Sequence, residues 1–116
     1  MSKLTVKDLF EKKGKVKLTE LYVTNALEAY AAEQAGIDIQ IVSFKKYTLR
    51  TGVPTNRWFR DAHIKDIRDA APNTFMIYGL GQLSSAEKTM DAALIARDNG
   101  ADAVYCGNSP KYIEAL

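Results

Sequence analysis

An alternation of strand-like and helix-like segments most constrains what this chain can fold into. Short runs rich in β-branched and aromatic residues are typical of buried strands. A first strand is expected within 15–23, and further strands are expected at 37–44, 74–81 and 101–106. Segments with apolar residues at helical spacing separate them, and these helices are expected at 25–36, 57–71 and 83–100. This alternation predicts βαβ units, a parallel sheet of about four strands and a single α/β domain over residues 1–116.

Signals at the helix ends support the three helices. Asn25, followed by Glu28, is a candidate N-cap for the first helix, and Ser84 with Glu87 forms a capping box for the third. Two glycines, Gly36 and Gly100, can end these helices in the left-handed conformation. The apolar stripes carry Leu27, Tyr30, Ala31, Gln34 and Ala35 in the first helix, Phe59, His63, Ile67 and Ala70 in the second, and Ala86, Met90, Ala93, Leu94 and Arg97 in the third.

Charge and cysteine content exclude several classes of function. The 16 Lys and Arg residues nearly balance the 14 Asp and Glu residues, and a net charge of +2 is too small to predict a nucleic-acid surface. No apolar run approaches the roughly 20 residues that a membrane span needs. The single cysteine, Cys106, cannot form an internal disulfide, which is typical of a reducing compartment. We expect a cytoplasmic protein with no nucleic-acid or membrane partner.

The C-terminal segment begins a further helix. Ser109 and Pro110 are suited to its N-cap and first helical position. The following residues, KYIEAL, end at Leu116 after less than two turns and without a C-cap signal. Because so short a helix is marginal by itself, a longer fold is expected to continue beyond this point.

Four segments carry a resemblance to a known family. They are VKDLFEKKGK (6–15), EAYAAEQAGID (28–38), HIKDIRDAAPN (63–73) and NGADAV (99–104). In this order and spacing the chain resembles ketopantoate hydroxymethyltransferase, in the superfamily of phosphoenolpyruvate mutase and isocitrate lyase. The resemblance implies a (βα)8 barrel, of which these residues would form the N-terminal half, with Mg²⁺ and a folate one-carbon donor as cofactors. It also implies a small 2-oxo acid as the substrate.

Half a barrel leaves two sheet edges open, which is an aggregation liability. Three arrangements would resolve this: a fragment completed by a missing C-terminal half, a half barrel completed by a second copy, and an open flavodoxin-like sheet. The unfinished C-terminal helix favours the fragment.

The residues that the family uses for chemistry are replaced in this chain. Where the family's second strand ends in Gly-Asp-Ser, with a metal-binding aspartate, the matching positions are Ser43, Phe44 and Lys45. A second metal-binding aspartate corresponds to Gly79, and a lysine and a glutamate on strand four correspond to Tyr105 and Gly107. Mg²⁺ is normally held by carboxylate oxygens and water, so these residues predict no metal site, and the catalytic residues are unknown.

A modest oxyanion pocket is still expected where the strands end. GLGQ (79–82) and GNSP (107–110) each place backbone N–H groups at a helix N-terminus, which can meet an anion. The predicted residues for binding a small carboxylate or 2-oxo acid are Lys45, Tyr78, Gly79, Tyr105, Gly107 and Asn108.

If the resemblance sets the strand phase, alternate side chains face the barrel interior. These are Gln40, Val42 and Phe44 in the second strand, Phe75, Ile77 and Gly79 in the third, and Ala101, Ala103, Tyr105 and Gly107 in the fourth. Cys106 then points toward the helix layer and serves packing rather than nucleophilic chemistry. His63 lies on the apolar side of its helix, far in register from any strand end, and is expected to be structural.

Two hypotheses for function follow. In the first, the chain belongs to a divergent barrel enzyme that acts on a small 2-oxo acid by one-carbon transfer or carbon–carbon lyase chemistry. In the second, the fold has lost catalysis and serves as a binding or assembly module. The missing carboxylates and lysine favour the second for these 116 residues alone, and the resemblance favours the first for a complete barrel. The expected partner in such a barrel is either a second copy, in a homo-oligomer, or the missing C-terminal half.

Overall fold

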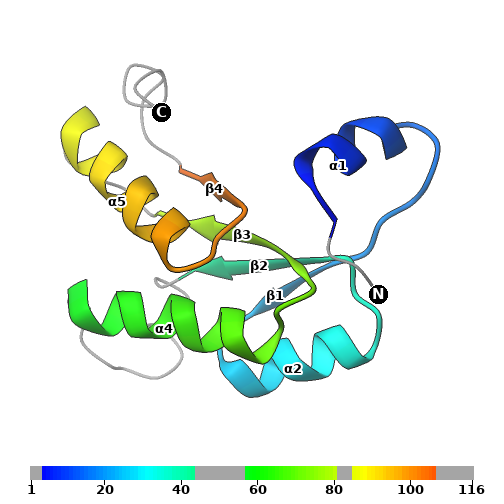
Figure 1. The fold of residues 1–116 in the computed structure, drawn as a ribbon, viewed down its shortest axis with the longest axis horizontal. Coiled ribbons are helices and arrows are strands. Elements are labelled where there is room, and N and C mark those ends of the chain that lie inside the picture. The colour runs from blue at the N-terminus through cyan, green and yellow to red at the C-terminus, as the bar shows by residue number, and fades with distance from the viewer. Residues whose placement is uncertain (1–3, 44–56, 81–84, 107–116) are drawn as a thin grey trace.

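The computed structural model describes residues 4–43, 57–80 and 85–106. Within them, strands and helices alternate along the chain (Figure 1). The elements are α1 (Val6–Lys12), β1 (Glu20–Val23), α2 (Ala26–Gln34), β2 (Ile39–Ser43), α4 (Arg57–Ala70), β3 (Phe75–Gly79), α5 (Ala86–Asp98) and β4 (Ala103–Tyr105).

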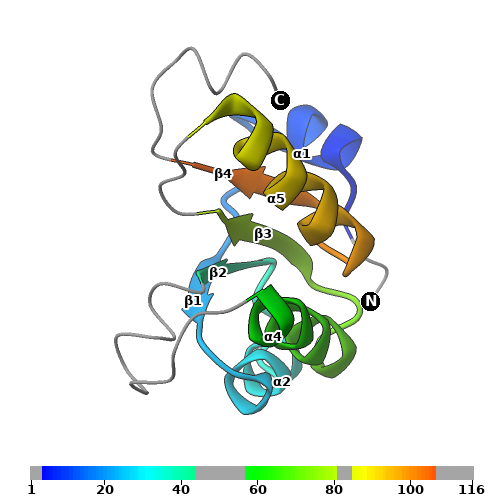
Figure 2. The same cartoon turned by 90° about the vertical axis from the view of Figure 1, so that its left-hand side faces the viewer.

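The strands form one 4-stranded sheet in the order β1-β2-β3-β4, and every neighbouring pair is parallel. Helices α2, α4 and α5 lie along one side of this sheet (Figure 2). Each strand thus lies beside the one before it, and the connecting helices return over the same face, as in a barrel. A flavodoxin-like sheet would place its second strand outside its first. The described sheet therefore has the winding of a partial barrel and not of the open-sheet alternative.

The larger core lies between the sheet and these three helices. The strands contribute Val23, Val42, Met76 and Tyr78, and the helices contribute Ala29, Ala32, Ile64, Ile67, Ala92 and Ala96, all of them buried. Burial of this apolar area, at about 25 cal/mol per Å², is the main force that holds the helices on the sheet.

A smaller cluster covers the opposite face of the sheet. Ile39, Ile41 and Phe75 are buried there beneath Leu4, Leu9 and Leu18, from α1 and its flanks. A capping box begins α1, in which the Asp8 backbone N–H donates to Thr5 Oγ1 at 3.1 Å and the Thr5 N–H donates to Asp8 Oδ2 at 2.9 Å. The face that would be a barrel interior is thus closed at the N-terminal ends of the central strands.

Two of the three predicted apolar stripes were wrong. In α2 the buried residues are Ala29 and Ala32, whereas Leu27 and Tyr30 are 76% and 54% exposed. In α5 the buried residues are Thr89, Ala92 and Ala96, while Leu94 and Arg97 lie outside. Small side chains let both helix backbones approach the sheet closely, so the small-residue faces are buried. The predicted cap of α5 was one residue too early, because the N-cap is Ser85, which accepts a hydrogen bond from the Lys88 N–H at 3.1 Å.

Other local predictions are confirmed. Asn25 caps α2 and accepts from the Glu28 N–H at 2.8 Å, and Gly36 and Gly100 adopt φ of 81° and 107° after α2 and α5. In α4, His63 and Ile67 are buried as expected and Ala70 is half-buried. The Phe59 side chain lies outside the described residues. No helix in the described ranges is long and apolar enough to cross a membrane.

The predicted phase of the second strand was wrong by one residue. Gln40 and Val42 face the helices, and Ile39 and Ile41 face the opposite side. The register pairs Ile41 with Ile77, and this places both on the α1 side. A parallel strand buried on both faces is apolar throughout, so its sequence does not show which side chains face inward. The phases predicted for Ile77 in β3 and for Ala103 in β4 are confirmed.

Arg68 joins α4 to the N-terminal ends of β3 and β4. Its Nη1 donates to the carbonyl oxygen of Thr74 at 2.9 Å, and its Nη2 lies 2.8 Å from Asp102 Oδ2. The same carboxylate oxygen accepts from the Met76 N–H at 3.0 Å. With side chains only 12% and 15% exposed, this ion pair fixes the end of the sheet opposite the predicted pocket.

Candidate functional site at the C-terminal strand ends

The C-terminal ends of β2, β3 and β4 meet in register. Ser43 pairs with Gly79, and Gly79 pairs with Tyr105. Barrel enzymes assemble their active sites at this end of the sheet. These strand ends are therefore the first place to look for a site.

Tyr105 lies directly over Gly79. A Cβ built on Gly79 would lie 2.6 Å from both Cζ and the hydroxyl oxygen of Tyr105, far inside van der Waals contact. The two strands are also joined here by the Leu80 N–H, which donates to the Tyr105 carbonyl at 2.9 Å. Tyr105 is 42% exposed, so the ring covers the strand end while part of the side chain contacts solvent. A glycine at position 79 is what makes this arrangement possible.

Tyr78 lies on the other side of the sheet. Its side chain is 1% exposed and belongs to the core beneath the helices, paired in register with Val104. Successive side chains along a strand point to opposite faces, so Tyr78 and Tyr105 cannot line one pocket together. The structure thus brings two of the six predicted binding residues together, Gly79 and Tyr105. Lys45, Gly107 and Asn108 lie outside the described residues, and whether they bind substrate stays a prediction.

His63 is nearer to a strand end than the sequence indicated. Its Nε2 lies 2.9 Å from the carbonyl oxygen of Thr24, the residue that follows β1. A carbonyl oxygen accepts only, so Nε2 carries the proton of the neutral ring. Burial lowers the pKa of His63 from its ordinary 6.5, against the opposing effects of the Thr24 hydrogen bond and nearby Asp66. The imidazole is therefore neutral at neutral pH.

A carboxylate extends this cluster. The Thr24 N–H donates to Glu28 Oε1 at 2.9 Å, and the Thr24 hydroxyl donates to the same oxygen. Thr24, Glu28 and His63 thus connect the end of β1 to α2 and α4. The signal for this cluster in the sequence is the polar pair Thr24 and Asn25 directly after a strand. From the sequence, this position was interpreted only as the cap of the following helix.

Cys106 packs as predicted. It is half-buried and lies against the core beneath the helices. Its sulfur is therefore on the face opposite Tyr105.

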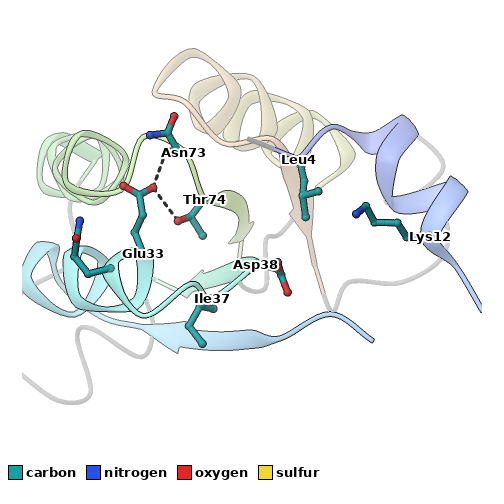
Figure 3. Close-up of a pocket in the computed structure, with 8 residues that line it drawn as sticks. Leu4, Lys12, Glu33, Ile37, Asp38, Asn73 and Thr74 are labelled. Carbon is teal, nitrogen blue, oxygen red and sulfur yellow. Dashed lines mark hydrogen bonds between the residues drawn. The ribbon is translucent and has the colours of Figure 1, made fainter. Parts of the chain in front are cut away.

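A hollow of about 420 Å³ lies at the N-terminal end of the sheet, beside Glu33 and Asp38 (Figure 3). Its carboxylates already have partners. Glu33 Oε1 accepts from the Asn73 N–H at 2.7 Å and from Thr74 Oγ1 at 2.9 Å. Asp38 Oδ2 accepts from the N–H and the hydroxyl of Thr19 at 2.9 and 3.1 Å. These contacts tie loops together, so we assign this hollow to the stability of the fold.

The described strand ends do not fit the Mg²⁺ that the family resemblance implies. Mg²⁺ takes carboxylate and water oxygens in near-octahedral geometry. Gly79 offers no side-chain ligand, and the Tyr105 ring occupies the space that an aspartate at position 79 would need. Within the described ranges, no group of three or more His, Cys, Asp or Glu side chains lies close enough together to hold a metal.

Comparison with known proteins identifies the fold. The sequence matches no protein-family model and no curated protein. Three solved structures are similar over 87% of this chain. They are phosphonopyruvate hydrolase in complex with oxalate and Mg²⁺, with TM-score 0.71 and 18% identity, and phosphoenolpyruvate phosphomutase from Streptomyces platensis subsp. rosaceus, with TM-score 0.69 and 17% identity. The third is 2,3-dimethylmalate lyase, a member of the PEP mutase/isocitrate lyase superfamily, with TM-score 0.65 and 14% identity.

The chain covers 38%, 37% and 39% of these three proteins. At such low identity the likeness establishes the fold alone. The prediction of four parallel strands arranged as part of a barrel is confirmed.

Proposed function

We propose that this chain builds part of a barrel of the PEP mutase/isocitrate lyase type, which binds a small 2-oxo acid or dicarboxylate at the C-terminal strand ends. The observation that carries the proposal is the Tyr105 ring lying over Gly79 on the face that becomes the barrel interior. The complex of the similar phosphonopyruvate hydrolase with oxalate and Mg²⁺ supports this class of ligand.

Tyr105 can bind such a ligand without a metal. A partly exposed phenol is a hydrogen-bond donor for a carboxylate, and hydrogen bonds to charged groups are worth about 1.5–3 kcal/mol. The ring over Gly79 also forms a flat apolar wall for the carbon skeleton. Gly79 lets the ring lie flat, and the phenol then orients the carboxylate.

For the complete barrel, the resemblance to ketopantoate hydroxymethyltransferase supports one-carbon transfer as the more specific activity. Carbon–carbon lyase chemistry is the alternative. Among the described residues, Gly79 and Tyr105 stand where the resemblance implies an aspartate and a lysine. These replacements favour the second candidate for the 116 residues alone, which is a binding or assembly module without turnover.

Titration of the chain with oxalate and with 2-oxoisovalerate, followed by NMR in EDTA and again in Mg²⁺, tests the proposal. We expect binding in EDTA, with the largest shifts at 79–80 and 104–106. Tyr105→Phe keeps the ring over Gly79 and removes the hydroxyl, so it should weaken binding roughly tenfold or more.

Tyr30→Phe removes the same group from the outer face of α2, where Tyr30 is 54% exposed, and should leave binding unchanged. Absence of binding by the unsubstituted chain, or equal affinity in Tyr105→Phe, would refute the carboxylate site. Turnover of 2-oxoisovalerate in a one-carbon transfer assay would refute the non-catalytic candidate and leave the binding site standing.

A further inference from the structure

A second tyrosine lies on the same face of the sheet as Tyr105, on the strand at the opposite edge. Tyr22 of β1 pairs in register with Ile41, which packs in the cluster beneath α1. Residues that pair in register share a face of the sheet, so Tyr22 lies on the side that becomes the barrel interior. Tyr22 is 49% exposed and Tyr105 is 42% exposed. The carboxylate site proposed above uses only one of these two phenols.

The stagger of barrel strands decides how high Tyr22 lies relative to Tyr105. In register, Tyr22 is level with Ile41, Ile77 and Ala103. In a barrel of this type the strands tilt by about 36°, and a shear of about eight residues over eight strands amounts to about one residue per strand. With the usual strand twist and right-handed crossovers, each step from β1 toward β4 places the paired residue deeper in the barrel. Tyr22 therefore lies about three residues above Ala103, near the height of Tyr105 and at the mouth of the barrel.

The Tyr105 side chain leans from β4 toward β1. Its hydroxyl oxygen lies 2.6 Å from where a Cβ on Gly79 would be, so the phenol is already over β3. Neighbouring strands are about 4.8 Å apart, which leaves about 10 Å of sheet between this hydroxyl and the backbone of β1. Tyr22 stands on the far side of that interval. The sheet between the two tyrosines is apolar on this face, since Ile41 and Ile77 belong to the cluster there.

The end of β1 is anchored directly beyond Tyr22. Thr24 is 7% exposed, its carbonyl oxygen accepts from His63 Nε2 at 2.9 Å, and its N–H donates to Glu28 Oε1 at 2.9 Å. Helices α2 and α4 thus hold the strand end from outside, while the pairing with Ile41 holds the backbone of Tyr22. A binding side chain on a fixed strand is positioned more precisely than one on a loop. The Thr24–Glu28–His63 cluster therefore serves to position Tyr22.

We propose that Tyr22 is a second ligand-contacting residue, which selects ligands that carry a polar group at the end remote from Tyr105. This inference rests on the carboxylate site proposed above. Tyr105 donates to one carboxylate, the carbon skeleton lies over Ile41 and Ile77, and the Tyr22 hydroxyl donates to a second carboxylate. A short dicarboxylate such as succinate presents a carboxylate at each end. The isopropyl end of 2-oxoisovalerate has no acceptor for the Tyr22 hydroxyl, so Tyr22 discriminates between these two ligands.

Calorimetric titration in EDTA with succinate and with 2-oxoisovalerate tests the inference. Tyr22→Phe keeps the ring and its packing and removes only the hydroxyl, so it should weaken succinate binding about tenfold and leave 2-oxoisovalerate binding unchanged. Tyr105→Phe should weaken the binding of both ligands. Tyr30→Phe, on the outer face of α2, is the matched control and should affect neither. In NMR spectra of the unsubstituted chain, succinate should shift the backbone amides at 21–23, and 2-oxoisovalerate should not.

The outcomes separate this inference from the proposal on which it rests. Unchanged succinate binding in Tyr22→Phe, or an equal loss of both ligands, would overturn the role of Tyr22. If Tyr105→Phe still weakens both ligands in that case, the carboxylate site stands and only the selection by Tyr22 is refuted. If the unsubstituted chain binds neither ligand, the carboxylate site and the role of Tyr22 are refuted together.

Discussion

The ring of Tyr105 fills the space above Gly79, 2.6 Å from where a Cβ on that residue would lie. This contact joins β3 to β4 at their C-terminal ends. A glycine at position 79 leaves the volume that the phenol ring fills.

The first prediction concerns this contact. Gly79→Ala should displace the Tyr105 ring toward solvent, because the ring is the part that can move, and should cost about 1 kcal/mol of unfolding free energy. Urea denaturation measures the cost, and the chemical shifts of the Tyr105 ring report its displacement. In a Tyr105→Ala background the same substitution should be nearly neutral, since the clash is gone. Equal costs in the two backgrounds would show that the ring does not contact position 79.

The second prediction concerns the Arg68–Asp102 ion pair. Asp102→Ala leaves a largely buried guanidinium without its carboxylate and the Met76 N–H without its acceptor. Removing one partner of a buried pair costs about 3–5 kcal/mol, and the loss should be read from denaturant unfolding. Asp98→Ala removes the carboxylate of an exposed pair with Arg97, whose side chains are 69% and 66% exposed, and should change stability by less than about 1 kcal/mol. A similar small effect for Asp102→Ala would contradict the role assigned to Arg68.

The third prediction follows from Gln40. Its side chain is fully buried, and neither amide atom has a hydrogen-bond partner among the described residues. A buried polar group without a partner costs about 1–3 kcal/mol, so Gln40→Met, which keeps the length of the side chain, should stabilise the protein by that order. Thermal and urea unfolding check the gain. Gln34→Met on the exposed side of α2 is the matched control and should be neutral. A destabilised Gln40→Met variant would show that the amide is satisfied in solution.

The fourth prediction is a dependence of stability on pH through His63. Burial lowers the pKa of this histidine in the folded protein below its ordinary 6.5, so the unfolded chain binds the proton more readily. The stabilisation is fully present above pH 6.5 and is lost as the pH falls from there through the folded pKa. Unfolding free energies measured between pH 8 and pH 5 should therefore decline in the natural chain. His63→Gln retains a donor for the Thr24 carbonyl and should flatten the decline, whereas an unchanged slope would assign it to other groups.

Much of the fold could be predicted because its signals are local. The caps at Asn25, Gly36 and Gly100 depend on backbone groups within a few residues, and they appear where the sequence placed them. The buried faces of α2 and α5 could not be predicted in the same way. Leu27 and Leu94 have helical spacing, yet close packing on the sheet selected the alanine faces.

The candidate site also contains residues that could be predicted from the sequence and residues that could not. Gly79 and Tyr105 were predicted to face the same side because the strand phase that the resemblance implied was correct for both β3 and β4. Tyr78 was predicted to join the same site because it is adjacent to Gly79 in the sequence. Neighbouring side chains in a strand point to opposite faces of the sheet, so this prediction was wrong. His63 was placed far from any strand end because its partner, Thr24, lies 39 residues away.

The sequence by itself determined the alternation of strands and helices, the parallel sheet and the caps at Asn25, Gly36 and Gly100, since each depends on local periodicity and capping chemistry. The tertiary structure decided which helix faces are buried, the phase of β2, the contact between Tyr105 and Gly79 and the approach of His63 to β1. These depend on how distant segments pack, and a strand or helix with apolar residues on more than one face does not encode that choice locally.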